Sequence, residues 1–279
     1  MSTRRSEYIP FNEAYIHVSA WGDPADPALI MWHGLARTGR DFDAAARGLS
    51  KDYFVICPDT LGRGLSCWAK DPASQYRLGE YGKQALSVIK HYKIESLRWF
   101  GTSMGALIGI YLAGGVLAGH ISHLVINDVG PEAPVGALER IVEYVGSPPA
   151  FENIPEFESW LRAVYATFGQ NDDEFWRTMA ETSSRRLPDG RITTHYDKKI
   201  VWQFTNDTTA MPLWPAYDRI SAKTLLTRGA DSDVLPLALA KEMRGRGPKP
   251  DYHAFANCGH APTFTTPEAI SVLDEFFAR

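Results

Sequence analysis

Residues 101–105 read Gly101-Thr102-Ser103-Met104-Gly105, a G-x-S-x-G pattern. A short apolar run at 97–100, typical of a buried strand, comes directly before it, and a helical pattern at 104–117 follows. Glycines are expected on both sides of such a strand-to-helix turn, because side chains there would collide with neighbouring segments. The pattern predicts that Ser103 projects its hydroxyl away from the sheet, at a helix N-terminus that favours developing negative charge.

Short apolar runs alternate with helical patterns on both sides of this turn, which predicts a mostly parallel sheet. The first two runs are expected to form a hairpin, and the later runs are typical of strands buried on both faces. The expected strands lie at 8–11, 15–21, 28–32, 54–57, 97–100, 124–126, 224–226 and 252–255. The sequence therefore predicts an α/β fold, in which a mostly parallel eight-stranded sheet is flanked by helices.

The alternation stops between the sixth and seventh expected strands, where helical patterns replace strand patterns. One apolar stripe runs along residues 157–168 at helical spacing. We therefore expect a core domain at 1–130 and 217–279, and an inserted helical cap, or lid, at 131–216.

A serine hydroxyl is a weak nucleophile at neutral pH and needs a base. Among the 8 histidines, His260 is the best candidate, since it stands in a loop between the last expected strand and the last expected helix. A histidine there can reach across the C-terminal edge of the sheet toward Ser103. The other histidines lie in strand or helix patterns, in the expected cap, or, for His33, just after the third strand.

The base in turn needs a carboxylate that holds its tautomer and stabilises the imidazolium. Asp231 and Asp233 share the loop after the seventh expected strand, and we expect only one of them to face His260. We take Asp233 as this acid and Asp231 as the alternative. Asp128, after the sixth expected strand, is a third candidate. The order Ser103, Asp233, His260 along the chain is the order expected for one specific fold.

Five motifs in the same order resemble those of the α/β-hydrolase fold, in its lipase- and esterase-like branch with a helical cap. The motifs are His33-Gly34, Asp59-Thr60-Leu61-Gly62-Arg63-Gly64-Leu65-Ser66, the 101–105 turn, Arg228-Gly229 through Pro236, and Gly259-His260-Ala261-Pro262. The resemblance covers essentially the whole chain. It implies a catalytic triad with Ser103 as the nucleophile, His260 as the base and Asp233 as the orienting acid.

The resemblance also implies an oxyanion hole formed by the backbone N–H groups of Leu35 and Met104, with His33 bracing its loop. In the implied reaction, His260 takes the proton of Ser103 while Oγ attacks a carbonyl carbon, and the two N–H groups hold the oxyanion. An alcohol then leaves, and water hydrolyses the acyl-enzyme. Serine rather than aspartate at the turn argues against haloalkane dehalogenase and epoxide hydrolase chemistry.

We expect a carboxylic ester hydrolase (a serine esterase) that acts on a small or medium, largely apolar substrate under the cap. Because the inserted region is rich in aromatic residues, Trp160, Trp176 and Trp214 are candidates for the substrate pocket. Two alternatives stay open. One is hydrolysis of a carbon–carbon bond in a ring-fission product or β-diketone, and the other is a ligand receptor on the same fold with slow turnover.

The composition excludes several other classes of protein. The 279 residues carry a formal net charge of −4 at pH 7, so the basic surplus of a nucleic-acid binder is missing. No H-E-x-x-H motif or phosphate-binding loop appears, and we expect neither a metal nor a cofactor. Residues 99–119 lack charged side chains, but their glycines favour a strand, a turn and a helix over a membrane span. The sequence thus predicts a cytoplasmic enzyme whose partner is a small-molecule ester, without a nucleic-acid or membrane partner; a homodimer is left open.

Overall fold

The protein is described by a computed structural model covering residues 3–206 and 212–279. Its centre is an eight-stranded sheet with the order β1-β2-β4-β3-β5-β6-β9-β10. The pairs β1/β2 and β2/β4 are antiparallel, and the other neighbours are parallel. The strands are β1 (Arg5–Phe11), β2 (Ala14–Trp21), β3 (Ala28–Trp32), β4 (Phe54–Pro58), β5 (Leu97–Thr102), β6 (Ile121–Asn127), β9 (Lys223–Gly229) and β10 (Asp251–Phe255). The predicted mostly parallel eight-stranded sheet is confirmed.

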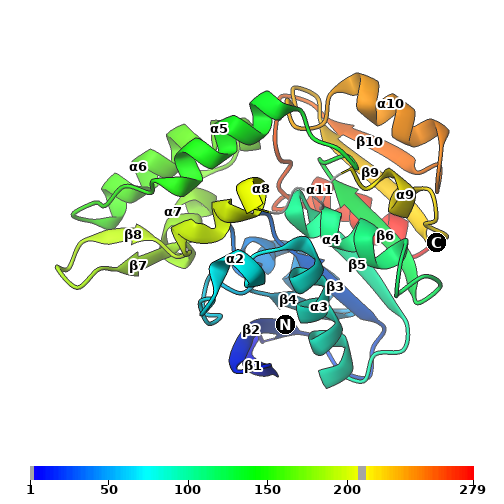
Figure 1. The fold of residues 1–279 in the computed structure, drawn as a ribbon. Coiled ribbons are helices and arrows are strands. Elements are labelled where there is room, and N and C mark those ends of the chain that lie inside the picture. Colours follow the sequence, from blue (N-terminus) through cyan, green and yellow to red (C-terminus); the bar gives the residue numbers. More distant parts are fainter. Residues whose placement is uncertain (1–2, 207–211) are drawn as a thin grey trace.

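Helices cover both faces of this sheet, because successive side chains of a buried strand point to opposite sides. In β3, Trp32 packs into the core layer that contains α3 and α4, and Met31 packs into the layer that contains α1 and α11. Figure 1 shows α3 and α4 on the near face of the sheet and α11 behind it. The core helices are η1 (Gly39–Phe42), α1 (Asp43–Leu49), α2 (Pro72–Gln75), α3 (Leu78–His91), α4 (Met104–Ala113), α9 (Trp214–Tyr217), α10 (Leu237–Gly245) and α11 (Pro267–Phe277).

An insertion leaves the sheet after β6 and lies to one side of it in Figure 1. It has its own hydrophobic cluster, which includes Phe157, Leu161 and Trp176. Its elements are α5 (Val135–Gly146), α6 (Ile154–Val164), η2 (Ala166–Phe168), α7 (Asp173–Thr182), β7 (Ser184–Arg186), β8 (Ile192–Thr194), η3 (Lys198–Val201) and α8 (Trp202–Asn206).

The β7–β8 ribbon of this insertion was not predicted, because strands of three residues are too short to show an alternating pattern. The cap boundaries at 131–216 stay a prediction, and residues 207–211 of that stretch lie outside the described residues. In the described part of the chain, none of the helices combines the length and the apolar character of a membrane span.

Candidate active site

Ser103 lies at the sharp turn between β5 and α4, with φ 51° and ψ −115°. This left-handed conformation is strained for a residue with a side chain, and close packing around the turn holds it. A Cβ atom on Gly101 would lie 2.3 Å from backbone atoms of Gly105, and one on Gly105 would lie 2.0 Å from the carbonyl oxygen of Trp32. Both glycines are therefore required for this turn, as the sequence predicted, and Ser103 directly precedes the first residue of α4.

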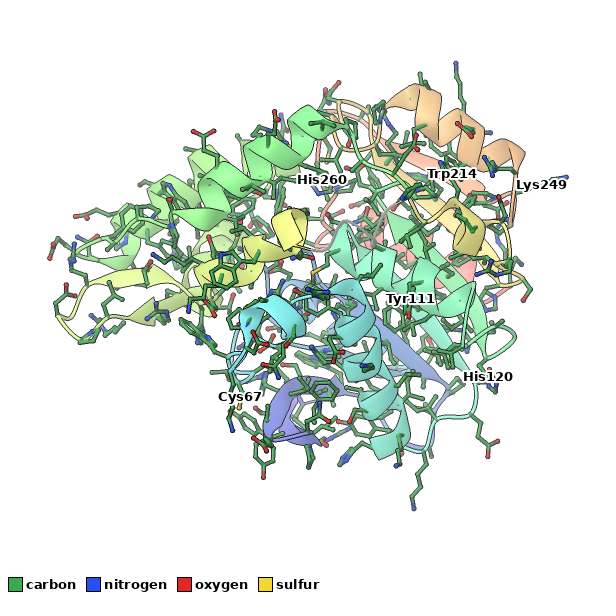
Figure 2. All side chains as sticks on the ribbon, in the orientation of Figure 1. Cys67, Tyr111, His120, Trp214, Lys249 and His260 are labelled. Atoms are coloured by element: carbon green, nitrogen blue, oxygen red, sulfur yellow. The ribbon has the colours of Figure 1, made fainter. Side chains whose placement is uncertain are left out.

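Ser103 belongs to a continuous hydrogen-bonded array. Its Oγ lies 3.0 Å from Nε2 of His260, and Nδ1 of His260 lies 2.8 Å from Oδ2 of Asp128. A carboxylate only accepts hydrogen bonds, so Nδ1 carries the proton and the lone pair of Nε2 is free to accept from the serine hydroxyl. The imidazole is only 13% exposed, and Figure 2 shows His260 where the helices of the insertion meet the core. The structure thus brings Ser103 and His260 together as expected from the sequence.

The carboxylate in this array is Asp128, which follows β6 and is fully buried. Its Oδ1 accepts the backbone N–H of Gly229 at 3.0 Å, and its Oδ2 accepts the hydroxyl of Ser232 at 2.8 Å as well as His260 Nδ1. The Ser232 hydroxyl donates to Asp128, because a carboxylate only accepts, and the hydroxyl oxygen also accepts the N–H of Leu235. Asp128 is therefore held rigidly against the imidazole by the neighbouring strand β9 and the loop that follows it.

The choice of Asp233 as the orienting acid is corrected by this geometry. The Asp233 carboxylate is half exposed and binds Arg140 on α5 at 2.7 Å. Asp231, the alternative, is also exposed. The two aspartates flank Ser232 in the turn after β9, which is closed by the bond from the N–H of Ser232 to the carbonyl oxygen of Gly229, and Ser232 is buried while both aspartates are exposed. Neither carboxylate forms a hydrogen bond with His260 in the described residues, while the Ser232 hydroxyl contacts Asp128, the acid that follows the neighbouring strand β6.

The loop after β3 approaches the serine closely. A Cβ atom on Gly34 would lie 3.7 Å from Cβ of Ser103. In the described residues, neither the N–H of Leu35 nor that of Met104 donates a hydrogen bond to another protein group. Buried or partly buried N–H groups normally have an acceptor, so these two are available to an oxygen atom beside Ser103.

His33 braces this loop, as expected. Its ring is fully buried, and Nε2 accepts the backbone N–H of Thr60 at 2.9 Å. Nδ1 must then carry the proton that is donated to the carbonyl oxygen of Gly34, 2.6 Å away. Burial lowers the pKa of His33 from 6.5 to about 4, so the ring stays neutral at pH 7. The Gly34 carbonyl is thereby fixed, and the N–H of Leu35 in the same trans peptide points the opposite way.

Asn127 is a residue of the site that the sequence analysis missed. It is fully buried, and its Nδ2 donates to Thr102 Oγ1 and to the carbonyl oxygen of Pro262, both at 3.0 Å. Its Oδ1 accepts the hydroxyl of Thr227 at 2.8 Å, and its carbonyl oxygen accepts the N–H of Ser103 at 2.9 Å. One residue thus joins the segments that carry the serine, the histidine and the aspartate.

The insertion also contacts the loop that carries His260. Thr167 of η2 donates its hydroxyl to the carbonyl oxygen of His260 at 2.8 Å and accepts the N–H of Gly259 at 2.7 Å. Asn171 accepts the hydroxyl of Thr263 at 2.9 Å. The position of the imidazole therefore depends on the insertion as well as on the core.

The three candidate pocket tryptophans have other contacts. Trp176 belongs to the insertion's own hydrophobic cluster, and Trp160 packs against that cluster. Trp214 donates its indole N–H to Glu132 at 3.0 Å, and Figure 2 shows it on the core, away from His260. The structure does not bring these side chains to Ser103, so their role in the pocket stays a prediction.

The thiols and possible metal ligands do not form a second reactive centre in the described residues. Cys57, Cys67 and Cys258 are free, and no cluster of three His, Cys, Asp or Glu side chains there could hold a metal ion. Cys258 lies two residues before His260. Burial raises the pKa of its thiol to about 12, so it stays protonated near neutral pH and is a weak nucleophile.

Comparisons with known proteins identify the family. A family profile described as alpha/beta hydrolase fold matches residues 27–267. The chain is 38% identical, over 267 residues, to a 3-hydroxybutyrate-oligomer hydrolase from Cupriavidus necator, with 92% of this chain and 90% of the relative covered.

Solved structures of hydrolases share the fold of this chain. An alpha/beta hydrolase from Novosphingobium aromaticivorans superposes with a TM-score of 0.90 at 32% identity, covering 100% of this chain and 99% of the other. E-2-(acetamidomethylene)succinate hydrolase has a TM-score of 0.88 at 20% identity, covering 99% and 100%, and shares the fold. The chain therefore belongs to the α/β-hydrolase fold family, and within it is a carboxylesterase-like hydrolase.

Proposed function

We propose that this hydrolase cleaves short 3-hydroxyacyl esters, of the kind that link 3-hydroxybutyrate oligomers, through an acyl-enzyme on Ser103. The observation that carries the proposal is the hydrogen-bonded array from Ser103 through His260 to Asp128, set at the N-terminus of α4. A buried carboxylate, an imidazole of fixed tautomer and a strained serine are the parts that nucleophilic acyl transfer requires.

In the proposed reaction, His260 Nε2 takes the hydroxyl proton while Ser103 Oγ attacks the ester carbonyl carbon. The imidazolium that forms is stabilised by Asp128 at Nδ1. His260 then returns the proton to the leaving alcohol, which is the hydroxyl end of the next hydroxyacyl unit. Water, deprotonated by His260, attacks the acyl-enzyme, so the second step releases the acid and regenerates Ser103.

The negative charge of each tetrahedral intermediate falls beside the free N–H groups of Leu35 and Met104. The close approach of the Gly34 loop to Ser103 supports this placement, and the N-terminus of α4 adds a favourable dipole. Removing one such donor typically costs about 10²–10³-fold in turnover.

The substrate class rests on the relative from Cupriavidus necator, which is similar over nearly its whole length. That relative is named for the hydrolysis of 3-hydroxybutyrate oligomers, and such a substrate agrees with the small or medium ester expected from the sequence. The proposed substrates are therefore small or medium esters whose acyl part carries a 3-hydroxyl group, either free or esterified.

The test uses the linear dimer and trimer of 3-hydroxybutyrate, with the p-nitrophenyl esters of butyrate and 3-hydroxybutyrate beside them. Release of 3-hydroxybutyrate is followed by chromatography for the wild type and Ser103→Ala. We expect turnover of the oligomers by the wild type, and its loss in the variant. Labelling of Ser103 by a fluorophosphonate gives an independent readout of the nucleophile.

The alternatives from the sequence are outcomes of the same panel. Cleavage of a β-diketone with no turnover of any ester would replace ester hydrolysis by carbon–carbon bond hydrolysis. Slow turnover of every substrate, with a melting temperature that rises with ligand, would indicate a receptor. Turnover of simple alkyl esters at the same rate as the oligomers would keep the mechanism and overturn the substrate class.

A further inference from the structure

Arg63 is a fully buried arginine in the loop after β4, and the proposed function gives it no role. Its Nε–H donates to the carbonyl oxygen of Leu35 at 2.8 Å, and Nη1 donates to the carbonyl oxygen of Leu61 at 2.7 Å. Its Nη2 lies 3.1 Å from Tyr81 Oη and 3.6 Å from Met104 Sδ. One guanidinium therefore contacts both residues whose N–H groups are proposed to hold the oxyanion.

The charge of Arg63 has no ionic partner in the described residues, because none of their salt bridges includes it. Asp59 in the same loop is bound instead to His17. The guanidinium lies over the rings of Tyr76 and Tyr81, 5.4 Å and 5.0 Å from their centroids. Backbone carbonyls and aromatic faces thus take the place of water around the cation. The buried carboxylates of Asp59 and Asp197 bind His17 and Tyr76 instead of the guanidinium.

The hydrogen bonds fix the backbone on both sides of Leu35. The peptide that precedes its Cα is held at the Gly34 carbonyl, which accepts from His33 Nδ1 and from the N–H of Arg37. The peptide that follows its Cα is held at the Leu35 carbonyl by Arg63. With both peptide planes fixed, the direction of the Leu35 N–H is set before a substrate binds.

We propose that Arg63 is a positioning residue of the oxyanion site. It orients the Leu35 N–H through the Leu35 carbonyl, and its buried positive charge stabilises the negative charge that forms on the tetrahedral intermediate. The charge acts most strongly there because the surroundings exclude water. The neutral ester and its neutral complex gain little from it, so the contribution belongs to the transition state. This inference rests on the proposed serine mechanism.

The test compares two ketone inhibitors of the same carbon skeleton that differ strongly in their ability to form the oxyanion, each measured with the wild type and the variants. A trifluoromethyl ketone analogue of the butyrate ester accepts Ser103 Oγ at its carbonyl carbon. The π electrons move to oxygen, and the hydroxyl proton goes to His260. The matching methyl ketone binds without forming this adduct in quantity. The ratio of the two inhibition constants therefore reports oxyanion stabilisation separately from binding of the neutral ligand.

Arg63→Met removes the charge and the hydrogen bonds but keeps most of the side-chain volume. We expect it to lower both kcat and the ketone ratio by about 10- to 100-fold, with KM and methyl ketone binding nearly unchanged. Arg63→Lys keeps a charge and loses the contact of Nε–H with Leu35, so we expect a smaller loss, of about 3- to 10-fold. Arg98→Met, on the far end of β5 and half-buried against Tyr53, is the matched control and should leave the ratio unchanged.

The outcomes separate this inference from the proposed function. If Arg63→Met folds and keeps the wild-type ketone ratio, the electrostatic role is wrong. If Arg63→Met does not fold, the test rests on Arg63→Lys. A wild-type ratio of the two ketone inhibition constants in that variant would contradict the positioning of Leu35 by Arg63. A uniform loss that also affects methyl ketone binding and the melting temperature would indicate a structural role only. If Ser103→Ala binds the trifluoromethyl ketone as the wild type does, the serine mechanism itself fails.

Discussion

Two regions of this molecule place a serine, a histidine and an aspartate in the same hydrogen-bonded order. One is the array at Ser103. The other lies at the edge of the sheet, where Ser6 Oγ is 2.7 Å from His17 Nε2 and His17 Nδ1 is 2.8 Å from Asp59 Oδ2. Figure 1 shows β1 and β2, which carry this second array, on the side of the core away from α10. By interatomic distance alone the two arrays are nearly equivalent.

The backbone around the serine distinguishes them. Ser6 lies inside the regular strand β1, opposite Ser19 of β2, whereas Ser103 has a left-handed φ and directly precedes α4. The carboxylate of the second array is also used differently. Asp59 accepts the N–H groups of Gly39 at 2.7 Å and Leu65 at 2.9 Å, so it ties two loops to the hairpin. We therefore take the array at Ser103, and not the one at Ser6, as the candidate active site, because its backbone also offers N–H groups to an oxygen atom beside the serine.

The strongest test of this distinction replaces the serine of each array. Ser103→Ala should lower ester turnover by about 10⁴- to 10⁶-fold, because the variant lacks the hydroxyl that forms the proposed acyl-enzyme. Ser6→Ala should leave turnover unchanged, since its hydroxyl only contacts His17. Both variants are assayed with p-nitrophenyl butyrate and with a fluorophosphonate label. Labelling of Ser6 in the Ser103→Ala protein would show that the second array is reactive after all.

The next test concerns the carboxylates. Asp128→Asn should lower kcat by about 10⁴-fold, because an amide no longer stabilises the imidazolium and favours the wrong tautomer. Asp233→Asn is the matched control and should change kcat by less than about twofold, since it breaks only an exposed ion pair with Arg140. The measurement is steady-state kinetics near neutral pH. A larger loss in the Asp233 variant would restore the assignment that the sequence suggested.

A smaller effect is expected from Asn127, which joins the three segments without touching a substrate. Asn127→Ser should lower kcat by about 10- to 100-fold with a nearly constant KM, because small displacements of the reacting groups are costly. Thr227→Val removes only the hydroxyl that donates to Asn127 Oδ1, and its loss should be smaller. If both variants keep the wild-type kcat, the amide network supports folding and not catalysis.

The second array should affect stability instead of turnover. Burial alone would raise the pKa of Asp59, but the hydrogen bond and the charge of His17, with smaller contributions from His33 and Leu65, hold it below its ordinary 3.8. A lowered folded-state pKa means that Asp59 stabilises the protein above pH 4, and that this contribution is lost as the pH falls through the folded-state pKa.

Asp59→Asn should therefore lower the free energy of unfolding by about 3 kcal/mol at pH 7 and reduce its decline between pH 5 and pH 3. Urea unfolding at several pH values measures both. The folded variant should keep its kcat. Asp251→Asn, which breaks an exposed pair with Arg279, is the control, and an equal loss in that variant would mean that burial of Asp59 is not the cause.

The sequence predicts the parts of the site whose geometry is local. The turn at Ser103 requires glycines two residues before and after it, and these can be read directly. The acid could not be assigned, because three aspartates follow neighbouring parallel strands and all lie at the same edge of the sheet. Asp128 turns inward with φ 61°, a conformation that aspartate tolerates. Whether it or Asp233 meets the imidazole depends on contacts between β6 and β9 that no local pattern records.

Asn127 could have been proposed, since a polar side chain at the end of a buried strand needs partners, and it directly precedes an aspartate. The partners themselves, Thr102, Thr227 and Pro262, come from three distant segments. The contacts of Thr167 with the His260 loop could not be predicted from the sequence either, because the packing of the insertion against the core decides which residues meet. For the three tryptophans the sequence predicted too much, since an aromatic stripe indicates burial but does not tell which side chains face a substrate pocket.

The smallest expected effect concerns the tryptophans of the insertion and the substrate specificity of the array at Ser103. Trp176 is buried beside Met179, and the guanidinium of Arg162 lies 5.6 Å from its ring centroid. Trp160 stacks on Phe157 with ring centroids 5.8 Å apart. Because both side chains pack within the insertion, Trp176→Phe and Trp160→Phe should each lower the free energy of unfolding by about 1–2 kcal/mol. The ratio of kcat/KM for p-nitrophenyl butyrate and octanoate should stay within about twofold of the wild type. A tenfold change in either variant would place that tryptophan at the acyl chain and would contradict a role limited to packing within the insertion.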